Sequence, residues 1–365
     1  MTEWYSIKNA EEVDSPALLI FPQLIKQNIL IAKGLALDHS VLRPHVKTHK
    51  MIEVAQMFIE EGINRFKCAT IAETEMLAMA GAKDVLLAYQ PAKAKARRLL
   101  ELVKKFPETV FSCLVDNEHS AGVLSQVFES QKIVAYIDLN IGMNRTGVKP
   151  QIVSPLFQYC ESLSNLEIIG LHAYDGHIHD TDVSARQKRC DEVLKVTNEV
   201  KEAIKKASGK QMKLILGGTP TFYLYSGKDT IETSPGTFVF WDEGYRSILP
   251  DLKFHLAAVL LVRVISIIDE TKLCLDLGHK AISSENPLPR IKFLNVEGVN
   301  EVGYSEEHLV VNVPDTSKHT IGDVWYGVPY HICPTVAVHS VAHVVENKTY
   351  TKKWKVIARD RAITV

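Results

Sequence analysis

The chain has 365 residues, of which 46% are hydrophobic and 23% are charged, and its formal net charge is -1. This balance disfavours nucleic acid and anionic membrane surfaces as partners, so we expect a small-molecule partner. The length suffices for a barrel of about 250 residues and a second domain of about 100.

The start of the chain, MTEWYSIKNAEEVDSPALLI, has no basic segment leading into an apolar run. No stretch reaches the ~18 consecutive apolar residues of a membrane span, so we expect a cytoplasmic protein without a membrane partner. The six cysteines are widely spaced and form no C-x-x-C pair, which disfavours a disulfide scaffold.

Residues 41–240 alternate short β-branched runs with longer segments of helical period, a pattern typical of repeated βα units around a parallel sheet. Helices are expected in segments rich in Ala, Leu, Glu and Lys, at residues 71–80, 93–106 and 185–207. Strands are expected at residues 41–47, 64–68, 85–89, 110–115, 133–139, 168–174, 213–217 and 237–240. Eight such units predict an α/β fold, a (β/α)8 TIM-type barrel.

After about residue 250 the pattern changes to strands of alternating polarity, such as HLAAVLLVRVISII and HLVVNV, separated by Gly, Pro and Asn turns. We therefore expect a barrel at residues 16–245 and a C-terminal β-rich domain at residues 246–365. Residues 1–15 have no helical period and are expected to join the β-rich domain.

The first expected strand ends in RPHVKTHK, a charged run where a buried barrel strand should be apolar. Barrel active sites lie at the C-terminal ends of the strands. Lys47 at such a position can form a Schiff base once burial or nearby cations leave part of it as the free amine. A solvated loop would explain the run equally well. The neighbouring candidates for such cations are Arg43, His45, His49 and Lys50.

Glycine-rich turns follow later strands. The segment GMNRTG presents Arg145, whose planar donors suit an anionic oxygen. GGTPT at residues 217–221 and SPGTF at residues 234–238 carry backbone N–H groups and hydroxyls that can hold a phosphate, and barrels often bind phosphate after strands seven and eight. Each turn alone is more often an ordinary tight turn, but the pair opposite a first-strand lysine favours a phosphate site.

Eight segments together resemble the D-threonine aldolase and D-serine dehydratase family, fold type III pyridoxal-phosphate (PLP) enzymes related to alanine racemase. They are RPHVKTHK, KCATIAETEML, GMNRTG, GGTPTF, SPGTFVFWD, DLGHKAISSENP, SEEH and HICPT. The match runs from about residue 14 to about residue 340. It implies a PLP-dependent, metal-assisted lyase that acts on β-hydroxy D-amino acids by retro-aldol cleavage or by dehydration, and it implies a homodimer.

The resemblance also implies roles for individual residues. The internal aldimine falls on Lys47, in a loop that His45 is expected to order, and the arginine that faces the phenolic oxygen falls on Arg145. Tyr174 matches the position near the pyridine ring. The phosphate turns fall on Gly218, Thr219, Gly236 and Thr237.

His331 and Cys333 stand two residues apart in VPYHICPT, which reads as a strand, so their side chains are expected on one face. An imidazole and a thiolate favour Zn²⁺. A core histidine and a core cysteine would explain the pair as well. The resemblance implies a divalent metal at this place, with zinc preferred for His-x-Cys and manganese or magnesium as alternatives.

Two histidines in DGHIH, His177 and His179, are candidates for a general base, and polar loop residues are an equal explanation. Three other functions stay open. A metal-free racemase of the alanine racemase type would not need His331 and Cys333. A non-catalytic PLP carrier would need no β-rich domain, and a barrel metallohydrolase without PLP would be colourless.

Overall fold

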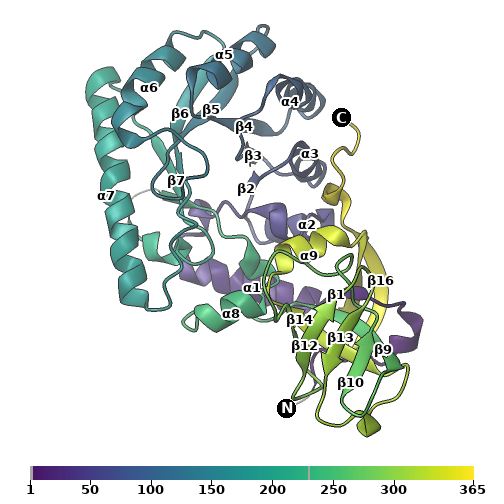
Figure 1. Cartoon of the computed structure of the whole chain (residues 1–365). Coiled ribbons are helices and arrows are strands. Elements are labelled where there is room, and N and C mark those ends of the chain that lie inside the picture. Colours follow the sequence, from purple (N-terminus) through teal and green to yellow (C-terminus); the bar gives the residue numbers. More distant parts are fainter. Residues whose placement is uncertain (1–2, 229–230) are drawn as a thin grey trace. The chain divides into compact units, whose positions relative to one another are not determined.

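The computed structural model describes residues 3–228 and 231–365, which form two compact units (Figure 1). The barrel unit comprises Leu30–Lys47, Ile52–Gly236 and Asp360–Val365. The β-rich unit comprises Met1–Ile29, Thr48–Met51 and Thr237–Arg359. Residues 1 and 2 of the expected N-terminal segment lie outside the described residues.

The barrel unit contains a parallel sheet in the order β2-β3-β4-β5-β6-β7-β8, with helices on its outside (Figure 1). Most residues of these strands are buried, as expected for a parallel sheet covered by helices. The strands are β2 Arg65–Cys68, β3 Asp84–Leu87, β4 Val110–Val115, β5 Ile133–Asp138, β6 Leu166–Ala173, β7 Lys213–Leu216 and β8 Ile231–Thr233. The helices are α2 Ile52–Glu60, α3 Ile71–Met79, α4 Lys93–Lys105, α5 Glu118–Val127, α6 Val153–Glu161 and α7 Val183–Ser208, and α1 Pro22–Leu35 ends in this unit.

The segment KCATIAETEML forms the turn from β2 into α3. Thr70 is the N-cap, and its hydroxyl accepts a hydrogen bond from the Glu73 N–H at 3.1 Å. The buried Glu73 carboxylate accepts in return from the Ala69 N–H at 2.6 Å. This reciprocal arrangement is a variant of the capping box and fixes where the helix begins.

Six expected strands agree with β2 to β7 within two residues, but the first and last do not. Residues 41–47 form no strand: the segment starts at the last residue of the 3-10 turn η2 His39–Val41 and ends within the 3-10 turn η3 Val46–Thr48. Two parallel bridges remain, Leu42 to Thr233 of β8 and His45 to Lys67 of β2. The segment therefore still closes the barrel between its first and last strands. The expected (β/α)8 fold is confirmed.

The misassigned strand at residues 41–47 contains a proline beside polar residues. Pro44 lies between the two bridges and has no N–H to donate to a ladder, so a regular strand cannot continue there. The expected strand at residues 237–240 is wrong as well, because it forms the 3-10 turn η6 Thr237–Val239. The last strand lies earlier, at β8.

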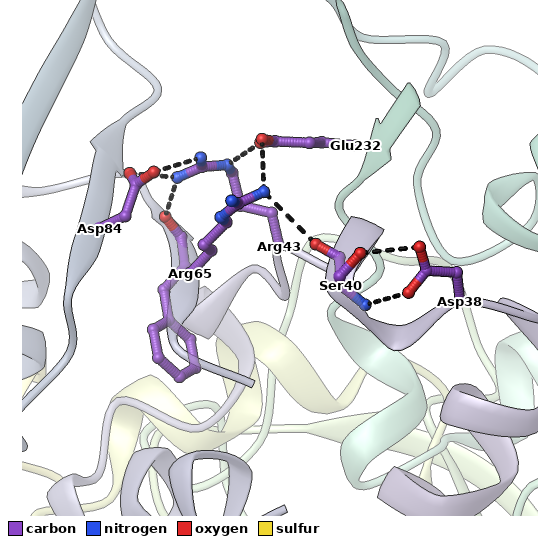
Figure 2. A network of polar contacts seen from close by, with 7 residues as sticks. Asp38, Ser40, Arg43, Arg65, Asp84 and Glu232 are labelled. Atoms are coloured by element: carbon purple, nitrogen blue, oxygen red, sulfur yellow. Dashed lines mark hydrogen bonds and ion pairs between the residues drawn. The ribbon is translucent and has the colours of Figure 1, made fainter. Parts of the chain in front are cut away.

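The closing segment is tied to the sheet by Arg43 (Figure 2). Its fully buried guanidinium forms two hydrogen bonds with Asp84 of β3, at 2.7 and 2.8 Å, and one with Glu232 of β8 at 2.6 Å. Asp84 is the first residue of its strand, so this network lies at the N-terminal end of the barrel, where residues serve stability. The sequence-based idea that Arg43 lies near the amine of Lys47 at the mouth is wrong.

The β-rich unit contains a mixed sheet in the order β12-β13-β10-β9-β1-β15-β16, and β14 pairs with both β9 and β11. Tyr5, Ile7 and Val13 of the N-terminal segment pack in the same core as Val259 and Leu261 of β9. The elements are β1 Ala17–Ile20, α8 Glu243–Ile248, β9 Ala258–Ile267, β10 Lys272–Leu275, β11 Ile291–Phe293, β12 Asn300–Tyr304, β13 Leu309–Asn312, β14 Val324–Pro329, α9 Ile332–Val338, β15 Val341–Glu346 and β16 Thr349–Lys355.

Replacing Arg43 by methionine should lower the free energy of unfolding by about 3–5 kcal/mol, because two carboxylates lose their buried partner. Arg65→Met is the matched control. Arg65 also contacts Glu232, at 3.1 Å, but its side chain is 46% exposed, so the cost should stay below about 1 kcal/mol. Urea unfolding of both variants measures the difference, and equal costs would contradict the closing role of Arg43.

Candidate active site

A cavity of about 400 Å³ lies in the barrel unit, bordered by residues at the C-terminal ends of several strands. Barrel active sites are built at this end. It brings together four of the predicted site residues: His45, Lys47, Arg145 and Tyr174.

Lys47 occupies η3, at the end of the closing segment, and is half-buried. Its backbone N–H donates to Nδ1 of His45 at 3.2 Å, so the histidine orders the turn that carries the lysine. The Arg145 guanidinium lies over the ring of Tyr174, with 5.1 Å from Cζ to the ring centroid. These side chains supply an amine, a cation and an aromatic ring to one cavity.

The GGTPT turn adjoins this cavity through Tyr174. A Cβ at Gly218 would lie 3.4 Å from Cε2 of Tyr174. Gly217 has a φ of +74°, and a Cβ there would lie 3.1 Å from Cα of Phe222, so both conformation and space require glycine. In SPGTF, the N–H of Gly236 donates to the hydroxyl of Thr219 at 3.0 Å, which joins the two turns.

Asp175 holds the first of these turns. Its buried carboxylate accepts from the Gly218 N–H at 3.1 Å and from the Tyr225 hydroxyl at 2.9 Å. Burial raises the pKa of Asp175. The sequence analysis missed both Asp175 and Tyr225, although Asp175 directly follows Tyr174 and is the first residue of the segment DGHIH.

One hydroxyl in SPGTF has no hydrogen-bond partner among the described residues. The Oγ atom of Ser234 is buried, and such an atom ordinarily finds a partner or a ligand. Ser234 precedes Gly236 by two residues, so the turn offers a hydroxyl as well as backbone groups. Thr237, the next predicted phosphate residue, begins η6 and is counted with the β-rich unit.

A chain of three titratable side chains borders the cavity and was also missed. Nζ of Lys67 lies 3.2 Å from Nε2 of His172, and Nδ1 of His172 lies 2.7 Å from Oδ1 of Asp138. We call these three residues the Lys67 relay. A lysine in a short strand is usually expected to face solvent. The only sign of this group in the sequence was the unusual polarity of β2.

The two histidines proposed as bases do not border this cavity. His177 lines a second cavity of about 480 Å³ together with Gly142 and Arg189. A Cβ at Gly142 would lie 2.7 Å from Nε2 of His177, so the glycine permits close packing. His179 is exposed.

His331 and Cys333 lie in the β-rich unit, and the expected strand there is wrong. Cys333 belongs to α9, and His331 is the N-cap of this helix. A proline is tolerated in the first helical turn, where Pro334 stands, and the Thr335 hydroxyl donates to the His331 carbonyl at 2.8 Å.

The two side chains nevertheless interact. Burial alone would lower the pKa of His331, but Cys333 and Glu285 raise it to about 9. Nδ1 of His331 lies 2.5 Å from the Glu285 carboxylate. Sγ of Cys333 lies 3.1 Å from Oγ1 of Thr48, which follows Lys47 in the sequence. Among residues 3–228 and 231–365, no cluster of three or more His, Cys, Asp or Glu side chains is arranged to hold a metal.

Comparisons with known proteins agree with this architecture. The family described as "Alanine racemase, N-terminal domain" matches residues 20–243, and the one described as "Putative serine dehydratase domain" matches residues 257–345. A D-threonine aldolase of Arthrobacter sp is 28% identical, covering 95% of this chain and 93% of the relative. A D-serine dehydratase of Dictyostelium discoideum is 24% identical, covering 92% and 94%.

Solved structures are similar over nearly the whole chain. The D-threonine aldolase from Filomicrobium marinum superposes with a TM-score of 0.88 at 25% identity, covering 97% of this chain and 98% of the other. An alanine racemase from Bacillus anthracis gives a TM-score of 0.70 at 14% identity, covering 93% and 97%, which shows a shared fold.

Fold and site thus define an alanine racemase-like barrel protein with a lysine at the barrel mouth. The chain belongs to the alanine racemase N-terminal domain family. The comparisons confirm the resemblance to D-threonine aldolases and D-serine dehydratases, and with it the expected class of enzyme, a lyase. In the part of the chain that the structure describes, no helix combines the length and the apolar character needed to cross a bilayer.

Removing the Tyr225 hydroxyl should loosen the GGTPT turn, because the buried Asp175 loses a donor. Tyr225→Phe is expected to cost about 1–3 kcal/mol of unfolding free energy. Tyr159→Phe, at a half-buried tyrosine of α6, is the control and should cost less. Thermal unfolding of both variants measures which substitution costs more stability. If Tyr225→Phe were as stable as the wild type, the hydroxyl would not support the turn.

Proposed function

We propose that this chain is a PLP-dependent lyase that acts on β-hydroxy D-amino acids, with Lys47 as the residue that carries the cofactor. The observation behind the proposal is that Lys47, Arg145 and Tyr174 line one cavity in a member of this family. The aldolases and dehydratases among the relatives support this substrate class.

The residues present fit PLP. An amine for the aldehyde, a guanidinium for the phenolic oxygen and an aromatic ring border one cavity. In the two glycine turns the N–H groups of Gly218 and Gly236 already donate to Asp175 and Thr219, and the partnerless hydroxyl of Ser234 offers a donor for a phosphate. When bound, PLP supplies an acceptor for the electrons of a bond broken at the substrate Cα. In this proposal Gly218, Thr219, Gly236 and Thr237 hold the phosphate.

The chain's own residues set the conditions for that chemistry. His45 orders the turn of Lys47, and Asp175 fixes the Gly218 N–H. His177 and His179 follow β6 and remain candidates for the general base in the proposal. Their replacement by asparagine tests that role.

His331 and Cys333 fit a divalent metal by their donor chemistry. Glu285 can accept the Nδ1 proton of His331, which would leave Nε2 free to bind a metal; a carboxylate commonly orients a metal-binding histidine in this way. An imidazole with a thiolate suits Zn²⁺, with Mn²⁺ or Mg²⁺ as alternatives. The ion would act as a Lewis acid on the β-hydroxyl of the substrate. A metal-free racemase is the alternative, and the contact between His331 and Cys333 favours the lyase.

Both aldol cleavage and dehydration require a β-hydroxy amino acid, and the relatives include an aldolase and a dehydratase by name. Incubation with D-threonine, D-serine and D-3-hydroxyaspartate separates them by product, since cleavage yields glycine and an aldehyde whereas dehydration leads to a keto acid and ammonia. A cytoplasmic homodimer completes the proposal.

Lys47→Ala should remove the visible absorption of the lysine-bound cofactor together with activity, because no imine can form at this position. Lys83→Ala, at an exposed lysine just before β3, is the control and should keep both. Absorption spectra and product assays measure the effect. Retention of both properties in Lys47→Ala would refute the assignment.

Cys333→Ala should abolish stoichiometric zinc binding and metal-dependent turnover while PLP stays bound, because a principal ligand is lost. Glu285→Gln should weaken zinc affinity about 10–100-fold through the histidine it orients. Cys274→Ala, at another buried cysteine of the β-rich unit, is the control. Metal analysis and zinc titration measure both effects, and full activity of Cys333→Ala in strong chelator would discard the metal.

A further inference from the structure

The cavity that contains Lys47 contains a second amine, that of Lys67. Lys67 is the third residue of β2 and is only 3% exposed. Its ammonium lies over the ring of Tyr174, with 5.3 Å from Nζ to the ring centroid. Two lysines and Arg145 thus border a cavity of about 400 Å³.

The hydrogen bonds of the Lys67 relay determine which of its nitrogen atoms carry protons. The Asp138 carboxylate is held by the Thr146 hydroxyl at 2.8 Å and the Gln90 amide at 2.9 Å. It therefore accepts from Nδ1–H of His172, at 2.7 Å. Nε2 of that neutral imidazole is left as an acceptor for the Lys67 ammonium. Burial, followed by the charge of Lys67, lowers the pKa of His172, which agrees with this neutral form.

Charges of both signs surround Lys67, but within residues 3–228 and 231–365 no carboxylate forms an ion pair with its ammonium. Burial and then the charge of Lys47 lower the pKa of Lys67 to about 7. An amine of this kind can change its charge near neutral pH. The titratable and charged groups that line this cavity or act on Lys67 are His45, Lys47, Tyr89, Asp138, Arg145, His172, Tyr174 and Asp175.

We propose that Lys67 is a positioning residue that, through His172 and Asp138, controls how much positive charge faces the lysine-bound cofactor. The inference rests on the proposed function. Two cations that border one cavity raise each other's free energy, so an ammonium at the buried Lys67 disfavours a proton on the nitrogen that would join Lys47 to the cofactor. Loss of that ammonium makes the same protonation easier.

The test is a pH titration of the absorption of the bound cofactor in the PLP-loaded protein, from about pH 5 to about pH 10. Lys67→Met removes the charge with little change in length, and Lys67→Arg keeps it at every pH. The midpoints should rise in the order Lys67→Arg, wild type, Lys67→Met, with about one pH unit or more between the extremes. Lys83→Met should match the wild type.

Coincident midpoints, or spectra that the two substitutions leave unchanged, would overturn the role of Lys67 while Lys47 still binds PLP. Should Lys67→Met not fold, Lys67→Gln replaces it. A cofactor that borohydride reduction fixes on Lys67 rather than Lys47 would overturn this inference and the assignment of Lys47 together. A colourless protein that binds no PLP would refute the proposed function itself.

Discussion

Barrel closure by the short segment before Lys47 is the constraint on which the site depends. Leu42 and His45 provide only two bridges to the neighbouring strands. The buried Arg43 adds direct ion pairs to β3 and β8 at the opposite end from the cavity. Because Lys47 follows four residues later, the same ion pairs that close the barrel also determine where its amine emerges.

The cationic side chains at the two ends of the barrel therefore have different roles. At the N-terminal end, Arg43 is paired with carboxylates, and removing one partner would leave a buried charge uncompensated. At the C-terminal end, Lys47, Lys67 and Arg145 border a cavity that suits an anionic, aromatic cofactor. Burying the Lys67 ammonium lowers the stability of the fold. Such a cost is common at functional sites, where a buried charge takes part in the reaction.

Sequence patterns predicted the repeated parts of the fold well, because β3 to β7 are mostly apolar runs that alternate with helices, whereas β2 also contains Arg65 and Lys67. They failed at the closing segment, where Pro44 and buried charges replace the apolar pattern, and at residues 237–240, whose Phe and Val pack in a turn. Residues 331–333 were also predicted as a strand, from the two-residue spacing of His331 and Cys333 alone. Pro334 is compatible with the first turn of the helix that the structure has there. Lys67 was missed because its burial comes from closure of the barrel, which local sequence does not reveal.

The central claim is that the amine of Lys47 is covalently joined to PLP. A crystal structure of the PLP-reconstituted protein tests it most directly. The account predicts continuous electron density from Nζ of Lys47 to the cofactor, with the phosphate at the turns of Gly218 and Gly236. Density that leaves Lys47 unlinked, with the cavity empty or otherwise occupied, would contradict it.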